Sequence, residues 1–339
     1  MNRKNLILLL LIGLLLAPAF LLKGEGKFSG WMIGDYYYAL QNHNSAVTDN
    51  NGFWFRRIYF TYDNKMTDKT AMRFRLEMNS PGDFSTSTPL VPFVKDAYLS
   101  TKIGQHTLML GLIGTPMYDN VEDFWGYRAM EKTPIDLFKF GNSRDLGIGL
   151  KGSLDHEKIL TYTLVFGNGS NNKSETNRGK AIYGRLNFQP TPSLFFEAYG
   201  DYTDMGNDSS VNILQAFAGV KGNWGRSGLN FGVRNCRQAG VDSDLKFISL
   251  FGVFNAGKKL DLVCRYDRLL DANPVGSKID YIPMADNAKA NVILAGLGWS
   301  PSDSVKVIPN LKYVFYDAPA IGEKPAADLY AYLTLYFKF

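Results

Sequence analysis

Residues 70–79, with the sequence TAMRFRLEMN, alternate charged or polar side chains with apolar ones. Arg73, Arg75 and Glu77 occupy positions of one parity, and large apolar side chains occupy the positions between them. A guanidinium group donates several hydrogen bonds in a fixed fork and suits oxyanions, whereas a carboxylate repels them. Held in one row, these three residues could discriminate between solutes by the sign of their charge.

The same alternation recurs in two later segments, 181–188 and 260–268. A period of two residues is typical of β-strands, whose side chains point to opposite faces. Because the polar face carries full charges, we expect it to be wet. The residues that we predict to line an aqueous lumen are Arg57, Arg73, Arg75, Glu77, Arg185, Arg234, Arg265 and Lys312. The alternative role for each of them is to brace opposite walls through an ion pair.

The connections between the alternating segments differ regularly in length. Short connections fall near 64–69, 104–106, 155–158, 190–193, 224–227, 256–259 and 301–304. Longer connections fall near 41–52, 80–92, 116–143, 168–179, 204–210, 237–244, 270–287 and 317–326. About sixteen strands, with short turns at one rim and long loops at the other, are typical of a barrel in an outer membrane.

The final segment, 329–339, places Leu333 and Leu335 on an apolar face and Tyr332 and Thr334 on the opposite face. Lipid offers no hydrogen-bond partner to the backbone, so a sheet that spans a membrane must close on itself. We therefore predict that this segment pairs with the first strand. The predicted fold is an all-β, transmembrane, antiparallel up-and-down barrel of about 16 strands. The alternative, a secreted β-sandwich or propeller, would present polar outward faces.

The stretch 116–143 is much longer than the other connections and is rich in Phe, Trp and Tyr. Loops of this length in compact domains are usually functional or disordered, and the aromatic content argues against disorder. We predict that this third long loop folds into the lumen and forms a constriction. Its candidate residues are Tyr118, Asp119, Glu122, Asp123, Arg128, Glu131, Lys132 and Asp136. The alternative is an ordered lid outside the barrel.

Residues 1–23 combine a basic start, MNRKN, with a long apolar run. This pattern indicates a secretory signal peptide, cleaved between residues 19 and 26, before a barrel domain at 24–339. An uncleaved membrane anchor is the alternative. The net charge of +5 is small for 339 residues, and no run rich in Lys and Arg occurs. We therefore expect no nucleic-acid partner.

Residues suited to catalysis or metal binding are few. The three histidines are His43, His106 and His156, and the last two fall on predicted short turns. Without a base beside a nucleophile or a water molecule, a hydrolase has no means of activation. Cys236 and Cys264, the only cysteines, fall on segments that are not predicted neighbours, so we expect free thiols. We predict no enzyme, no cofactor and no metal site.

Three motifs together resemble the phosphate-selective porin O/P family: HTLMLGLIGTP, then EDFWGYRAMEKTPIDL, then SRDLGIGLKG. The match covers roughly residues 108–152, and the earlier stretch FRRIYFTYDNKMTDKTAMRFRLEMN resembles that family's early hairpin. The resemblance implies a homotrimeric porin in the outer membrane of a Gram-negative bacterium. Such a channel passes small hydrophilic solutes or ions by passive diffusion and can prefer anions.

The resemblance also implies that the final strand, which ends at Phe339, is recognised by the outer-membrane assembly machinery before insertion into lipid. It does not carry phosphate selectivity across, because the long loop holds more acids than bases. Its acids are Asp119, Glu122, Asp123, Glu131 and Asp136, and its bases are Arg128, Lys132 and Lys139. The alternative function is a structural or adhesive barrel with a closed lumen and loops that bind a partner.

Overall fold

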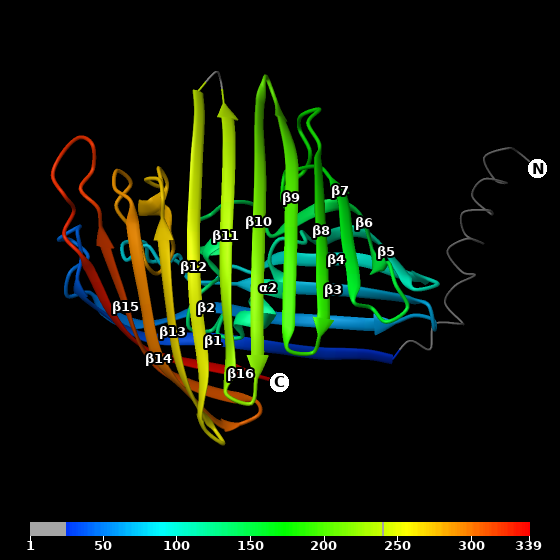
Figure 1. Cartoon of the computed structure of the whole chain (residues 1–339), viewed down its shortest axis with the longest axis horizontal. Helices are drawn as coiled ribbons and strands as arrows, with labels where there is room; N and C mark the ends of the chain where they lie inside the picture. Colours follow the sequence, from blue (N-terminus) through cyan, green and yellow to red (C-terminus); the bar gives the residue numbers. More distant parts are fainter. Residues whose placement is uncertain (1–24, 239–240) are drawn as a thin grey trace, which may run out of the picture.

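The computed structural model describes residues 25–238 and 241–339, which form one closed antiparallel barrel (Figure 1). The strands are β1 Glu25–Gln41, β2 Asn51–Lys65, β3 Thr70–Met78, β4 Phe93–Ile103, β5 His106–Gly114, β6 Arg144–Ser153, β7 Leu160–Gly167, β8 Ala181–Thr191, β9 Leu194–Gly206, β10 Ser209–Gly222, β11 Gly225–Gln238, β12 Val241–Gly257, β13 Leu260–Leu269, β14 Ala290–Ser302, β15 Val305–Tyr316 and β16 Asp328–Lys338. Each strand pairs with its neighbours in the sequence, which confirms the predicted sixteen-stranded up-and-down barrel. The predicted signal peptide, residues 1–23, lies outside the described residues.

The barrel closes where β16 pairs with β1. The register runs from Trp31 opposite Lys338 to Gln41 opposite Leu329. The backbones of Gly30 and Phe339 exchange two further hydrogen bonds, of 3.1 and 3.0 Å. The predicted pairing of the last segment with the first is confirmed, and it leaves neither strand with a free edge.

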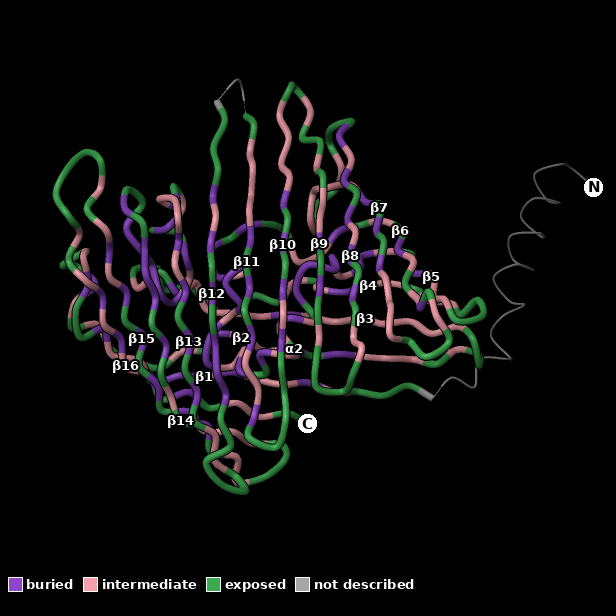
Figure 2. The backbone as a smooth tube through the Cα atoms, viewed as in Figure 1, coloured by how far each residue is buried: buried purple, intermediate pink, exposed green. Residues whose placement is uncertain are grey.

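The two faces of the final strand separate as the alternation predicts. Leu333 is 50% exposed on the outer surface, whereas Tyr330 and Thr334 point inward and are fully buried. Exposed and buried positions alternate along most strands in the same way (Figure 2). The outer surface is therefore apolar over strand after strand, as contact with lipid requires.

Two connections differ from the sequence prediction, which placed longer loops at 204–210 and 237–244. Strands β9 and β10 instead run on to a tight turn at Asn207 and Asp208, both with positive φ. Strands β11 and β12 likewise extend to Gln238 and from Val241. These hairpins rise above their neighbours in Figure 1. Both segments are polar, and a hairpin keeps its backbone pairing without an apolar face.

The third long loop, 115–143, lies inside the barrel, which confirms its predicted position. It contains the short helices α2 Asp119–Trp125 and α3 Pro134–Leu137. The connection 270–289, with the 3₁₀ helix η1 Gly276–Lys278, also packs inward. None of the helices in the described part of the chain is long and apolar enough to cross a membrane.

These two segments bury an apolar core against one half of the barrel wall. Inward side chains of β12 to β14, such as Phe247, Val263 and Leu294, are completely shielded from solvent. They pack against loop residues that include Phe138 and Ile282. The lumen is consequently filled by protein beside β12–β14, and the side chains that line its cavities come mainly from the other strands and from the loop 115–143.

Candidate functional site

A β-bulge in β2 turns two successive arginines towards the lumen. Ile33 of β1 pairs with Arg57, and the next residue, Gly34, pairs with Phe55, so Arg56 has no partner in the register. An unpaired extra residue lets two neighbouring side chains share one face of the sheet. Arg56 and Arg57 are both turned inward, although strict alternation would have sent Arg56 to the lipid.

A second bulge, in β4, has the same effect on Lys95 and Asp96. Arg75 of β3 pairs with Asp96, and Leu76 pairs with Val94, which leaves Lys95 as the extra residue. Val94 is exposed on the outer face, whereas Asp96 is buried. Two bulges on nearby strands therefore add two cations to the lumen wall beyond those that the alternation provides.

The charged side chains of this wall form three ion-paired groups, which together we call the basic wall: Arg57, Arg73, Arg75, Lys95 and Arg144, with the carboxylates Asp63, Glu77 and Asp96. Glu77 lies between Arg57, at 2.9 Å, and Lys95, at 2.8 Å. Asp96 bridges Arg75, at 3.2 Å, and Arg144. Because five cations share three carboxylates, the wall keeps a surplus of positive charge.

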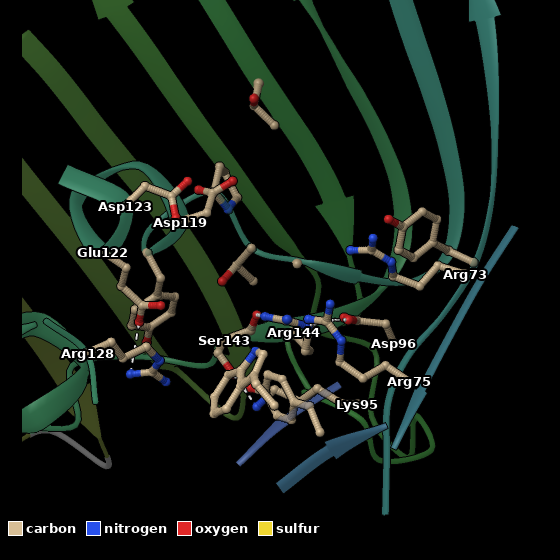
Figure 3. A pocket seen from close by; sticks show the side chains of 18 of the residues that line it. Arg73, Arg75, Lys95, Asp96, Asp119, Glu122, Asp123, Arg128, Ser143 and Arg144 are labelled. Carbon is tan, nitrogen blue, oxygen red and sulfur yellow. Dashed lines mark hydrogen bonds and ion pairs between the residues drawn. The ribbon is translucent and has the colours of Figure 1, made fainter. Parts of the chain in front are cut away.

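Helix α2 presents acids to the basic wall from the other side of the lumen (Figure 3). Asp119, Glu122 and Asp123 lie along the helix, and Arg128 joins Glu122, at 3.1 Å, to Asp136, at 2.9 Å. Burial raises the pKa of Glu122, although the charges of Arg128 and, from the wall, Arg57 act to lower it. Because the bases of the basic wall face the acids of α2, an electric field crosses the space between them.

The loop 115–143 is fixed in place by wall side chains that donate hydrogen bonds to its backbone carbonyls. These pairs are Arg185 with Pro116, Gln215 with Met117, Arg226 with Trp125, Arg56 with Met130, Arg265 with Lys132, and Asn273 with Phe138, at 2.7–3.1 Å. The donors come from strands around most of the barrel and from the connection 270–289. A loop without a sheet partner must satisfy its buried carbonyls in some such way.

One loop carboxylate is anchored by a fully buried ion pair. Glu131 Oε2 lies 2.6 Å from Lys312 Nζ of β15, and neither side chain is exposed. Burial alone would raise the pKa of Glu131, but the charges of Lys312 and Arg56 outweigh it and hold that pKa at about 2. Glu131 therefore stays ionised over the physiological range.

Glycines in the wall make room for the aromatic side chains of the loop. A Cβ at Gly219 would lie 2.5 Å from the ring of Phe124, and one at Gly298 would collide with the Tyr127 hydroxyl. Tyr127 Oη in turn donates to Asp261 Oδ2 at 2.5 Å. Glycine at these two positions lets the loop lie directly on the strands.

Two cavities lie on either side of the loop. The cavity nearer the short turns, the turn-side cavity, has a volume of about 600 Å³. Its charged lining comprises the bases Arg73, Arg75, Lys95, Arg128, Arg144, Lys151, Arg185 and Lys306, and the acids Asp96, Asp119, Glu122 and Asp123. The loop-side cavity, of about 520 Å³, is lined by the bases Arg56, Arg57, Lys132, Lys139 and Arg234, and by the acids Glu77, Asp136, Asp201 and Asp280. Positive charge predominates mainly in the turn-side cavity.

The residues predicted from the sequence fall into two groups in the structure. Those that line a cavity are Arg57, Arg73, Arg75, Glu77, Arg185 and Arg234 from the wall, and Tyr118, Asp119, Glu122, Asp123, Arg128, Lys132 and Asp136 from the loop. Arg265, Lys312 and Glu131 point inward but are buried where the loop meets the wall. Sequence reasoning missed Arg56, Lys95 and Arg144, and the alternation carries no signal for the two bulges.

Comparison with solved structures finds the same architecture in known porins. An anion-selective porin from Comamonas acidovorans matches with a TM-score of 0.68 at 12% identity, over 94% of this chain and 100% of that chain. OmpF of Salmonella typhi matches with a TM-score of 0.65 at 13% identity, over 93% and 98%. OmpT of Vibrio cholerae matches with a TM-score of 0.64 at 11% identity, over 93% and 98%.

No protein-family model matches the chain, and no curated protein matches it in sequence. The likeness to the solved structures shows that the chain has the fold of general bacterial porins with 16 strands and an infolded loop between β5 and β6. Nothing in these comparisons favours the phosphate-selective family over other porins of this fold.

Proposed function

We propose that this protein is a porin of the bacterial outer membrane, a water-filled channel through which small hydrophilic solutes and ions diffuse passively, with a preference for anions. The observation that carries the proposal is the turn-side cavity, whose lining holds eight basic and four acidic side chains. In a narrow aqueous pore, such a surplus attracts anions and repels cations. The apolar outer faces, the closed barrel and the infolded loop support the same conclusion.

The proposal extends to the setting of the channel. The outward side chains meet outer-membrane lipid, and the strand that ends at Phe339 is the segment that the outer-membrane assembly machinery recognises. The functional unit is a homotrimer, since one structural neighbour is a trimer form of OmpT from Vibrio cholerae. The transported class is small hydrophilic anions in general. Phosphate selectivity is not part of the proposal, because carboxylates partly neutralise the basic wall.

Reversal potentials across a planar bilayer in a KCl gradient test the proposal. The purified protein should produce stepwise channel openings. The potential at which the current is zero should be shifted from zero towards the equilibrium potential of chloride. A cation-selective channel would overturn the anion preference. A silent bilayer despite a folded, heat-modifiable barrel would overturn the channel itself and favour the closed, adhesive barrel.

A further inference from the structure

The turn-side cavity contains an aromatic patch that anion selectivity does not require: Trp31, Tyr59 and Tyr336 on the adjacent strands β1, β2 and β16. The ring centroids of Trp31 and Tyr59 are 4.2 Å apart, and those of Trp31 and Tyr336 are 6.0 Å apart. All three residues line the cavity, and Trp31 and Tyr336 remain partly exposed to it. Large aromatic surfaces beside an aqueous pore are available for stacking.

Positive charge borders this aromatic patch on both sides. The guanidinium of Arg75 lies over the Tyr59 ring, 4.8 Å from its centroid. Lys306 of β15 is the direct cross-strand neighbour of Tyr336 and lines the same cavity. Neighbouring strands lie about 4.8 Å apart, so β1 and β3 are separated by about 10 Å. A ligand whose ring lies on Trp31 and whose anionic group lies near Arg75 must therefore hold the two groups several ångströms apart.

The opposite side of the cavity constrains how such a molecule can lie. Asp119, Glu122 and Asp123 of α2 line the cavity across from the basic wall (Figure 3). They repel an anionic group and leave the wall as its favourable position. The aromatic patch lies on the wall side as well, so a ring and its charge can be held together on one surface.

We propose that the turn-side cavity is a binding subsite for anions that carry a planar ring, with nucleoside monophosphates as the representative class. The ring stacks on Trp31 and Tyr336, and the phosphate is held by Arg75 with Lys95 and Arg144 beyond it. A cavity of about 600 Å³ is large enough for such a molecule. This inference rests on the proposed channel function for its physiological meaning, but the binding itself can be measured separately.

A set of matched probes separates the contributions of ring and charge. Adenosine monophosphate carries both, ribose 5-phosphate lacks the base, and adenosine lacks the phosphate. Each is added to the bilayer chamber, and the concentration that halves the ionic current is measured. Base–aromatic stacking favours adenosine monophosphate over ribose 5-phosphate by about fivefold or more in half-blocking concentration. Adenosine should block least, because it gains nothing from the basic wall.

The variant Trp31→Leu should raise the half-blocking concentration of adenosine monophosphate to that of ribose 5-phosphate while leaving ribose 5-phosphate itself unchanged. Trp299→Leu is the matched control, because Trp299 lies on the outer surface and is 51% exposed. Tyr336→Leu provides a second variant should Trp31→Leu fail to fold. Equal block of the wild-type channel by adenosine monophosphate and ribose 5-phosphate would overturn the inference while leaving an anion-selective channel intact.

Isothermal titration calorimetry with the detergent-solubilised barrel measures the affinities of the same three probes directly. This measurement does not depend on a current across a bilayer. If the bilayer is silent, the proposed channel fails, and calorimetry still decides the subsite. Tighter binding of adenosine monophosphate than of ribose 5-phosphate, lost in Trp31→Leu, supports it. Equal or undetectable binding of both overturns it.

Discussion

Glu131 of the infolded loop and Lys312 of β15 form an ion pair of 2.6 Å in which both side chains are fully buried. Removing one partner leaves an uncompensated buried charge, which costs about 3–5 kcal/mol. We therefore expect Lys312→Met to loosen the loop, lower the thermal stability of the barrel in detergent and increase the current noise of open channels. Thermal unfolding and single-channel recording measure the two effects.

The double variant Glu131→Gln, Lys312→Met distinguishes a lost charge pair from lost packing. It removes both charges, so we expect its open-channel current noise to be lower and its thermal stability to be higher than those of Lys312→Met alone. Asp68→Asn, which breaks an ion pair in an exposed turn, should match the wild type in both measurements. A Lys312→Met protein indistinguishable from the wild type would show that this anchor does not hold the loop.

A second prediction concerns the packing of the loop against the strand at Gly298. Gly298→Ala places a methyl group against the Tyr127 hydroxyl, which donates to Asp261. Overpacking of this kind costs about 1–3 kcal/mol, and we expect displaced loop conformers that appear as additional conductance levels. Gly184→Ala is the matched control, since its Cβ would meet Leu164 at an ordinary 3.6 Å. Unaltered conductance levels in Gly298→Ala would contradict this packing.

Selectivity should become more anionic as the solution is acidified. Burial raises the pKa of Glu122 and of Asp123, so these two carboxylates lose their charge early as the pH falls. Reversal potentials between about pH 7 and pH 4 should then move further towards chloride. The shift of the reversal potential on acidification should be smaller in Glu122→Gln than in the wild type, because one of the two groups is already neutral in the variant. A shift towards potassium on acidification would refute the arrangement.

The anchor of the loop should survive this acidification. The pKa of Glu131 lies at about 2, below its ordinary value of 4.5. Its contribution to stability is therefore fully present above pH 4.5 and is lost as the pH falls towards 2. Current noise should stay constant down to about pH 4. Noise that rises together with the change in selectivity would mean that the loop itself responds to pH.

Removing two arginines from the basic wall should reverse part of the selectivity. Arg73→Ala with Arg75→Ala leaves Asp63 without its partner and Asp96 with Arg144 alone. The reversal potential in a KCl gradient should shift towards potassium. Arg268→Ala is the control, because Arg268 pairs with Asp317 away from both cavities. An unchanged reversal potential in the double variant would exclude these arginines from the ion path.

The sequence was sufficient to predict much of this architecture. A period of two residues defined the strands and their two faces, and the need of a sheet in lipid to satisfy its backbone predicted closure of β16 on β1. The length and aromatic content of 116–143 predicted an infolded loop. These features follow from lipid on one side of the sheet and water or protein on the other, which act at every residue.

The rest depends on contacts that alternation does not encode. A bulge adds one residue to one strand, so the inward positions of Arg56 and Lys95 can be known only from the register of the neighbouring strand. Alternation also cannot say whether an inward side chain meets water or protein. Arg265 and Lys312 were predicted to line the pore but are buried against the loop. The inward packing of 270–289 had no compositional signal.

Charge modification at Arg75 tests most directly that ions pass between the basic wall and α2. Arg75→Cys is placed in a Cys236→Ser, Cys264→Ser background and treated with a negatively or a positively charged methanethiosulfonate reagent during bilayer recording. We predict that the negative reagent moves the reversal potential towards potassium and that the positive reagent moves it back towards chloride. The account would be contradicted if neither reagent changed the current or the reversal potential although mass spectrometry showed that the cysteine had been modified. Ions would then not pass along this wall.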